Sequence, residues 1–267
     1  MEVTLDGATA FLADHGKGVD PARPTILFVH GAGMDHSVWP LQARHFAYRG
    51  WNALALDLPG HGRSGGEPCE TIGAMADWLW RLIKTLELAS VTLVGHSMGA
   101  LIGLETAARH RKRIEGVALL GAAPAMPVHP ALLAAAARPE PLAAELICDW
   151  GFGPAGHLGG HKAPGSWMMG HGMRLLARAA GRVLHADLAA CNAYDGGPAA
   201  AAKIRCPALV LAGARDRMTP ARQGARLAEA IRGAALVTLP GCGHMMMVEQ
   251  PDATLDALVA FAQADRS

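Results

Sequence analysis

The sequence lacks the features that mark disulfide-rich, membrane-spanning and nucleic-acid-binding proteins. Its five cysteines are scattered without a C-x-x-C pair, which argues against a disulfide framework or a zinc site and favours a reducing compartment. The longest apolar run, residues 117–126, is broken by Pro124 and is too short to span a bilayer. The 24 basic and 23 acidic residues balance, and no long basic run occurs. We therefore expect no metal or other cofactor, no nucleic-acid partner and no membrane association.

The beginning of the chain also lacks the pattern of a targeting segment. Its first basic residue, Lys17, comes after Glu2, Asp6 and Asp14, so no basic start is followed by an apolar run. We expect a cytoplasmic protein without a signal peptide. With 267 residues, 51% of them hydrophobic, the chain is long enough for one large α/β domain or for a domain with an inserted subdomain.

Eight short segments have the character of β-strands. Residues 2–5 and 9–13 flank Asp6-Gly7, a turn-favouring dipeptide, and predict an opening hairpin. Six apolar runs without strict alternation follow, as expected for strands covered on both faces; they span residues 26–29, 53–56, 91–94, 117–120, 208–211 and 236–239. Helical patterns separate most of them, and the clearest apolar face comprises Met75, Leu79, Leu82, Ile83 and Leu86. This alternation predicts an α/β fold with a parallel sheet between helices.

One interval breaks the alternation of strands and helices. Between Leu120 and Ala208 no good strand pattern occurs, but residues 124–141 contain five prolines and several short helical stretches follow one another. A compact domain rarely keeps a structureless loop of that length. We predict that residues 125–200 form an inserted helical cap, and that residues 1–124 and 201–267 form the core domain.

Two serines fit the pattern G-x-S-x-G, and their contexts differ. Ser97 in Gly95-His96-Ser97-Met98-Gly99 follows a strand pattern and precedes a helical one, which is the strand–turn–helix context of an exposed nucleophile. Glycines at 95 and 99 would allow strand and helix to approach closely, and the helix start would place a positive dipole end near the serine. Ser64 lies in a loop before Glu67-Pro68, where no helix can begin. The sequence favours Ser97.

A serine hydroxyl needs a general base, and that base needs an orienting acid. His244 lies in a glycine-rich loop after the last predicted strand, and Asp216 follows the preceding strand. Both loops leave the carboxyl edge of the sheet, as does the turn at Ser97. We predict the triad Ser97, Asp216, His244; the alternatives are a loop histidine and a helix N-cap aspartate before Pro220.

An oxyanion formed on acyl attack needs backbone N–H donors. The segment His30-Gly31-Ala32-Gly33 follows a strand and offers a flexible loop at the same edge. We predict the N–H groups of Met98 and Ala32 as the donors, with Gly31 or Gly33 as alternatives to Ala32. His30 is interpreted as a brace of this loop, with a direct catalytic part as the alternative.

Together these motifs resemble the α/β-hydrolase family over about residues 24–125 and 203–264. The branch that they resemble contains small esterases, cofactor-free haloperoxidase-like enzymes, enol-lactonases and ring-cleavage C–C hydrolases. The resemblance implies an eight-stranded, mainly parallel sheet and implies that Asp57 is a loop residue rather than the triad acid. A serine nucleophile argues against the dehalogenase and epoxide-hydrolase members.

The resemblance leaves the substrate open. Trp150, Trp167 and Met168 in the cap and Met245 beside the histidine are candidates for an apolar substrate pocket, with ordinary core packing as the alternative. We expect a serine hydrolase of small carboxylic esters or lactones. One alternative is a C–C hydrolase of ring-cleavage dienoates, which would need a cap arginine such as Arg174 or Arg178 for the substrate carboxylate. The other is a non-catalytic receptor with this fold.

Overall fold

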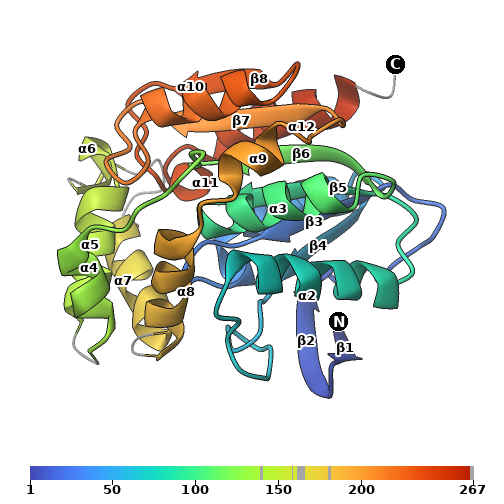
Figure 1. Ribbon diagram of the computed structural model, residues 1–267, viewed down its shortest axis with the longest axis horizontal. Helices are drawn as coiled ribbons and strands as arrows, with labels where there is room; N and C mark the ends of the chain where they lie inside the picture. Colours follow the sequence, from blue (N-terminus) through green and yellow to red (C-terminus); the bar gives the residue numbers. More distant parts are fainter. Residues whose placement is uncertain (139–140, 158, 161–165, 180–181, 265–267) are drawn as a thin grey trace.

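The structure is a computed structural model that describes residues 1–138, 141–157, 159–160, 166–179 and 182–264. Its centre is one eight-stranded sheet in the order β1-β2-β4-β3-β5-β6-β7-β8 (Figure 1). The strands are β1 Glu2–Leu5, β2 Ala8–Ala13, β3 Thr25–Val29, β4 Asn52–Leu56, β5 Val91–His96, β6 Ile114–Leu120, β7 Ala208–Gly213 and β8 Ala235–Leu239. Strand β2 runs antiparallel to both of its neighbours, whereas the strands from β4 to β8 are parallel. The predicted fold class and all eight strands are confirmed.

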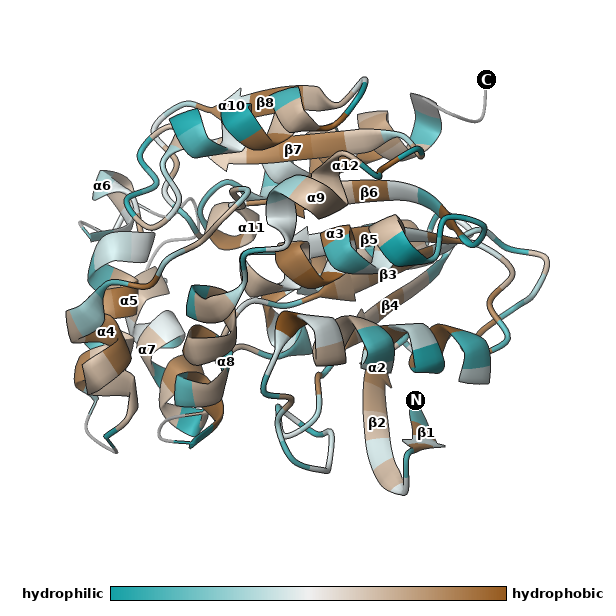
Figure 2. Cartoon of the chain, viewed as in Figure 1, coloured by the Kyte–Doolittle hydropathy of each residue, from teal (hydrophilic) through white to brown (hydrophobic). Residues whose placement is uncertain are grey.

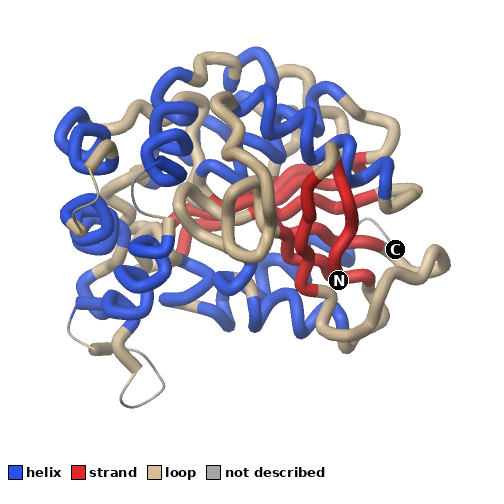
Figure 3. The backbone as a smooth tube through the Cα atoms, turned by 90° about the horizontal axis from the view of Figure 1, so that it is seen from below, coloured by secondary structure: helices blue, strands red, loops and turns tan. Residues whose placement is uncertain are grey.

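Two layers of helices cover the sheet (Figure 3). One contains α2 Ile72–Thr85, α3 Met98–Arg109, α9 Gly197–Ala201 and α10 Ala221–Ala230, and the other contains α1 Pro40–Ala47 and α12 Pro251–Ala264. The predicted apolar face of α2 is buried from Met75 to Ile83, and Leu86 stands at the C-cap. In Figure 2 hydrophobic residues follow the central strands while hydrophilic residues lie on the covering helices. Within the described residues, no helix is long and apolar enough to cross a membrane.

The prediction that every strand is covered on both faces is wrong for β8. Strands β3, β4, β5 and β7 are buried at every residue, but β8 has mostly exposed or half-buried positions, and Leu236 is 43% exposed. Strand β8 is the last strand at its edge of the sheet. An edge strand has a neighbour on one side only, which leaves part of it open to solvent.

A group of helices gathers at the carboxyl edge of the sheet, at the left of Figure 1. They are α4 Pro130–Ala136, α5 Leu142–Gly151, α6 Pro154–His157, α7 Met168–Arg178 and α8 Arg182–Ala193. These helices fall within the predicted cap, residues 125–200, although residues 139–140, 158, 161–165 and 180–181 of that range lie outside the described residues. The last helix of the interval, α9, packs against α3 and α10 and thus joins the core layer.

Two glycines allow β5 and α3 to meet around a single residue. A Cβ at Gly95 would lie 2.2 Å from the carbonyl oxygen of Gly99, and a Cβ at Gly99 would lie 2.3 Å from that of Val29. Neither neighbour is a flexible side chain, so the backbone would have to move. Glycine at 95 therefore lets β5 and α3 approach each other, and glycine at 99 lets α3 approach the end of β3.

We predict that Gly95→Ala destabilises the protein by about 1–3 kcal/mol, because the new methyl group overpacks the backbone of α3. The matched control is Gly103→Ala in α3, where a Cβ would meet Val117 at 3.7 Å and Leu93 at 4.0 Å, both ordinary contacts. The control should be neutral or slightly stabilising, because alanine favours helix. Urea unfolding of both variants measures the difference, and equal stabilities would contradict the prediction.

Candidate active site

Ser97 is the single residue between β5 and α3, and its backbone is strained. Its φ of +53° with ψ of −116° is a conformation that residues other than glycine rarely adopt. The backbone N–H donates to the carbonyl of Leu120 at 2.8 Å, and the carbonyl accepts the N–H of Ala100 at 2.9 Å. These bonds hold the turn, and the serine stands at the positive end of the α3 dipole.

Asp216 and His244 form a buried hydrogen-bonded pair. The ring Nδ1 of His244 lies 2.7 Å from Asp216 Oδ2, and the side chains are 2% and 0% exposed. The other carboxylate oxygen accepts the N–H groups of Met218 (2.8 Å) and Thr219 (2.7 Å). Because Nδ1–H donates to the carboxylate, Nε2 is left as the basic nitrogen. Asp216 does not occupy the N-cap position of α10, which belongs to Pro220.

Ser97 and His244 line the same cavity, of about 530 Å³, which we call the Ser97 cavity. Its wall includes Ala32 from the loop after β3, Ile147 of α5 and Leu188 of α8. The structure thus brings Ser97 and the Asp216–His244 pair to one place from three separate loops at the carboxyl edge.

His96, which precedes the serine, connects this turn to the histidine loop. Its Nε2 donates to the backbone carbonyl of His244 at 2.9 Å, and the two rings lie 4.7 Å apart. Burial lowers the pKa of His96 well below its usual value, and His244 lowers it further. A neutral His96 therefore fixes the distance between the serine turn and the loop of His244. No local sequence pattern predicts this role of His96.

The loop after β3 has one of its N–H groups already engaged. Gly33 N–H donates to the carboxylate of Asp187 at 2.8 Å, which removes Gly33 from the alternatives for an oxyanion donor. Ala32 lines the Ser97 cavity, and Met98 is the first residue of α3. The expected donors, the N–H groups of Ala32 and Met98, thus come from a loop that lines the Ser97 cavity and from the start of α3, and their role stays a prediction.

His30 braces this loop, as the sequence suggested. Its Nδ1–H donates to the carbonyl of Gly31 at 2.9 Å, and its Nε2 accepts the N–H of Leu58 at 3.1 Å. Burial lowers the pKa of His30 to about 4, with a further contribution from the neighbouring His61. The neutral ring is therefore the form that fits both hydrogen bonds.

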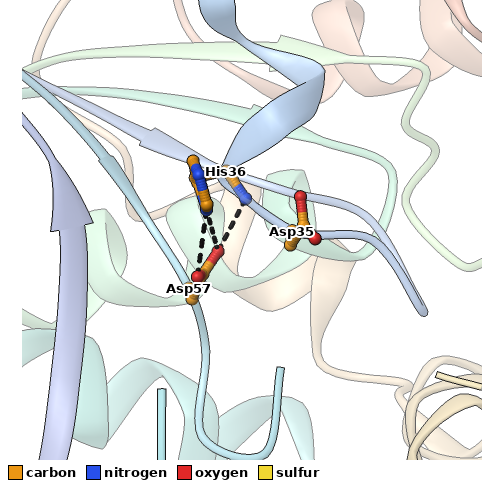
Figure 4. Close-up of side chains that lie close together, drawn as sticks. All are labelled: Asp35, His36 and Asp57. Carbon is orange, nitrogen blue, oxygen red and sulfur yellow. Dashed lines mark hydrogen bonds and ion pairs between the residues drawn. The ribbon is translucent and has the colours of Figure 1, made fainter. Parts of the chain in front are cut away.

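Asp57 is engaged in its own loop (Figure 4). Its oxygens accept the ring Nδ1–H of His36 at 2.8 Å and the N–H groups of His36 (2.7 Å) and Arg63 (2.8 Å). Asp35 lies beside them. One atom from each of the three side chains could serve as a metal ligand, and these three atoms lie within 4.8 Å of one another. Asp35 accepts from Ser37 N–H and pairs with Arg178. Because these atoms already have partners, the cluster is a structural brace.

Ser64, the second G-x-S-x-G serine, is also structural. Its hydroxyl donates to the carbonyl of Asp57 at 2.7 Å and accepts the N–H of Phe11 at 2.9 Å. Both bonds hold the loop after β4 against β2.

The four pocket candidates divide between two cavities. Trp150 and Met245 line the Ser97 cavity. Trp167 and Met168 instead line a neighbouring apolar cavity of about 450 Å³, which shares Met245 with the first and which we call the Trp167 cavity. Trp167 is 60% exposed at its rim. These two residues therefore belong to a different compartment from the one expected.

The cap arginines lie outside the Ser97 cavity. Arg174 and Arg178 line a third cavity of about 560 Å³, and Arg178 lies 3.4 Å from Asp35. The carboxylate clamp that the C–C hydrolase alternative would need is thus not placed at Ser97. A cation that does line the Ser97 cavity is Arg217, which is largely exposed and pairs with Asp149 at 3.6 Å.

Glu249 is a further residue that the sequence analysis missed. Its carboxylate accepts the N–H groups of Gly153 (2.7 Å), Gly243 (3.1 Å) and Met245 (3.1 Å). Burial raises its pKa, and these hydrogen bonds partly offset the effect. Glu249 thus fixes both sides of His244 and ties them to Gly153, between α5 and α6. No local motif marks it.

Known proteins resemble the chain throughout its length. Residues 26–257 match the model of the Alpha/beta hydrolase family. The chain is 30% identical over 260 residues to the putative carbamate hydrolase RutD of Agrobacterium fabrum, covering 92% of this chain and 95% of that protein. It is 26% identical over 263 residues to the (E)-2-((N-methylformamido)methylene)succinate hydrolase of Acinetobacter baylyi, covering 96% and 94%. The crystal structure of the enol-lactonase from Burkholderia xenovorans superposes with a TM-score of 0.84 at 26% identity, covering 98% and 100%.

The fold and these similarities define a hydrolase enzyme. The chain belongs to the Alpha/beta hydrolase family.

The lowered pKa of His30 predicts that the free energy of unfolding decreases as the pH falls. The unfolded chain binds the proton near pH 6.5 and the folded chain only near pH 4, so the stability due to the neutral ring is lost as the pH falls from 6.5 to 4. The loss amounts to about 3 kcal/mol. Urea unfolding from pH 7 to 4 should show this drop in the wild type and a smaller drop in His30→Gln. The same pH dependence in both proteins would contradict the assignment.

Proposed function

We propose that the protein hydrolyses small carboxylic esters or lactones with Ser97 as nucleophile, His244 as general base and Asp216 as orienting acid. The observation that carries the proposal is the buried Asp216–His244 bond of 2.7 Å, which leaves Nε2 of His244 basic at a cavity that Ser97 also lines. The strained backbone at Ser97 supports it, because such strain clusters at functional sites.

In the proposed reaction, Ser97 Oγ attacks the substrate carbonyl while His244 Nε2 takes the hydroxyl proton. The carbonyl oxygen becomes an oxyanion that the N–H groups of Ala32 and Met98 stabilise. Cleavage of the bond to the leaving oxygen, which receives the proton from His244, gives the acyl-enzyme. Water then attacks the acyl carbon while His244 Nε2 takes its proton. The bond from the acyl carbon to Ser97 Oγ breaks, Oγ takes the proton back from His244, and the carboxylic acid leaves.

The substrate class rests on the wall of the Ser97 cavity. The wall is mainly apolar and includes Met126, Val128, Leu132 and Trp150, so the acyl or alkyl group should be apolar. The related proteins are named as a carbamate hydrolase, an enol-lactonase and a succinate-derivative hydrolase, all of which act on small molecules. The cytoplasmic location expected from the sequence remains part of this proposal.

We predict that Ser97→Ala lowers kcat on a p-nitrophenyl ester by about 10³-fold or more, while Ser64→Ala largely keeps it. His244→Ala should match Ser97→Ala, and the double variant should be no worse, because the residues act as a unit. Asp216→Asn should be severe but milder, through the wrong imidazole tautomer. Steady-state kinetics measure these effects. Turnover by Ser97→Ala near that of the wild type would refute the assignment.

We further predict that kcat/KM on p-nitrophenyl esters rises with acyl length and then falls once the Ser97 cavity is full. Each added CH₂ should contribute about 0.8 kcal/mol until then. Val128→Trp narrows this cavity and should shift the optimum to shorter chains. Val248→Trp, which narrows only the Trp167 cavity, is the matched control and should leave the optimum unchanged.

Other outcomes of the substrate series distinguish the alternatives. A profile that still climbs at long, lipid-like chains would indicate an open, lipase-like site. Efficient cleavage of a dienoate with negligible esterase activity would favour the C–C hydrolase, and Arg217 would then be the cation to replace. Binding of small ligands without turnover of any substrate would favour the receptor.

A further inference from the structure

Asp187 connects the cap to two loops of the core. It lies in α8 and is completely buried. One oxygen, Oδ2, accepts the N–H of Gly33 in the loop after β3 and also the ring Nε2–H of His61 in the loop after β4, both at 2.8 Å. The other oxygen, Oδ1, is buried without a hydrogen-bond partner among the described residues. Such a carboxylate is costly to bury unless a charge balances it.

His61 provides that charge. Its Nδ1 lies 2.9 Å from the carbonyl of Pro59, so both ring nitrogens face oxygen acceptors and both carry a proton. Burial lowers the pKa of His61, but the bonds to Asp187 and Pro59 outweigh it and the pKa is raised. Asp57 adds to this effect, while His30, whose ring lies 4.9 Å away, is itself held neutral. The pair is therefore a buried imidazolium and carboxylate.

The bond to Gly33 acts on the peptide next to Ala32. Gly33 N–H and the carbonyl of Ala32 share one peptide plane, so the bond to Asp187 fixes one of the two planes that flank Ala32. Gly33 has a φ of +66°, and a Cβ there would lie 2.7 Å from Leu184 of α8. Leu184 of α8 thus packs closely against Gly33, the residue whose N–H donates to Asp187. Leu188 of the same helix lines the Ser97 cavity.

We propose that Asp187, charged through its pairing with His61, is a positioning residue that holds Gly33 and thereby aims the Ala32 N–H at the oxyanion. Docking of α8 from the cap completes the oxyanion site. This inference rests on the proposed function, because it assigns the geometry of a donor in that reaction. Positioning of the Ala32 N–H should stabilise the transition state more than it strengthens substrate binding, since the oxyanion forms only on attack.

The test compares Asp187→Ala with Asp195→Asn, an exposed aspartate after α8, as control. In Asp187→Ala we expect kcat to fall about 10- to 100-fold while KM changes less than about threefold. Affinity for an aryl trifluoromethyl ketone, which forms an oxyanion on the serine, should fall by the same factor as kcat/KM. Asp187→Asn keeps one oxygen acceptor for Gly33 and should recover part of kcat. The control should behave as the wild type.

A second variant covers the case in which Asp187→Ala does not fold. His61→Gln keeps a donor toward Asp187 but removes the positive charge, and we expect the same selective loss of kcat and ketone affinity. Titration with a fluorophosphonate gives the concentration of active sites. Dividing the maximal rate by this concentration gives a kcat that refers to folded enzyme only. A lowered melting temperature with unchanged kcat per site and unchanged ketone affinity would overturn the proposal and leave a structural role. Turnover retained by Ser97→Ala would instead refute the underlying function.

Discussion

The contact between β5 and α3 is the constraint on which the site depends. Only Ser97 separates the two elements; the strand and the helix meet where Gly95 has no side chain, and Gly99 lets the same helix pack against the end of β3. This contact forces the positive φ of Ser97 and places it at the start of α3. The sheet then brings the loops after β7 and β8 to the same edge, because parallel strands end together. The geometry of Ser97 is thus a consequence of backbone packing.

Buried histidines in defined protonation states hold the loops around Ser97. His96 and His30 are kept neutral by burial and bind backbone groups of the His244 loop and of the loop after β3. His61 is kept charged by Asp187. The two hydrogen bonds of His30 fit the neutral ring, and the two of His61 fit the doubly protonated ring. The geometry of the site should therefore depend on pH through these supporting histidines.

Local sequence patterns predicted the strands, helices and turns, because interactions between residues close in sequence determine these elements. The eight strands, the helix at Met75 and the turn at Ser97 follow from apolar periodicity and glycine spacing. The Asp216–His244 bond could be anticipated because both residues follow adjacent strands. The bracing role of His30 could be anticipated, but the contacts of Asp187 and Glu249 could not. Asp187 meets Gly33 across 154 residues, and Glu249 meets Gly153 across 96, so no short motif records either contact. Trp167 and Met168 line the neighbouring cavity rather than the Ser97 cavity, and composition could not say which cavity each would face.

The most direct test of the account is to find which atom a fluorophosphonate modifies. The account predicts one adduct per chain, located by peptide mass spectrometry at Ser97, and much slower labelling in His244→Ala because the base that activates the hydroxyl is gone. An adduct on another residue, or equal labelling rates in His244→Ala and the wild type, would contradict it.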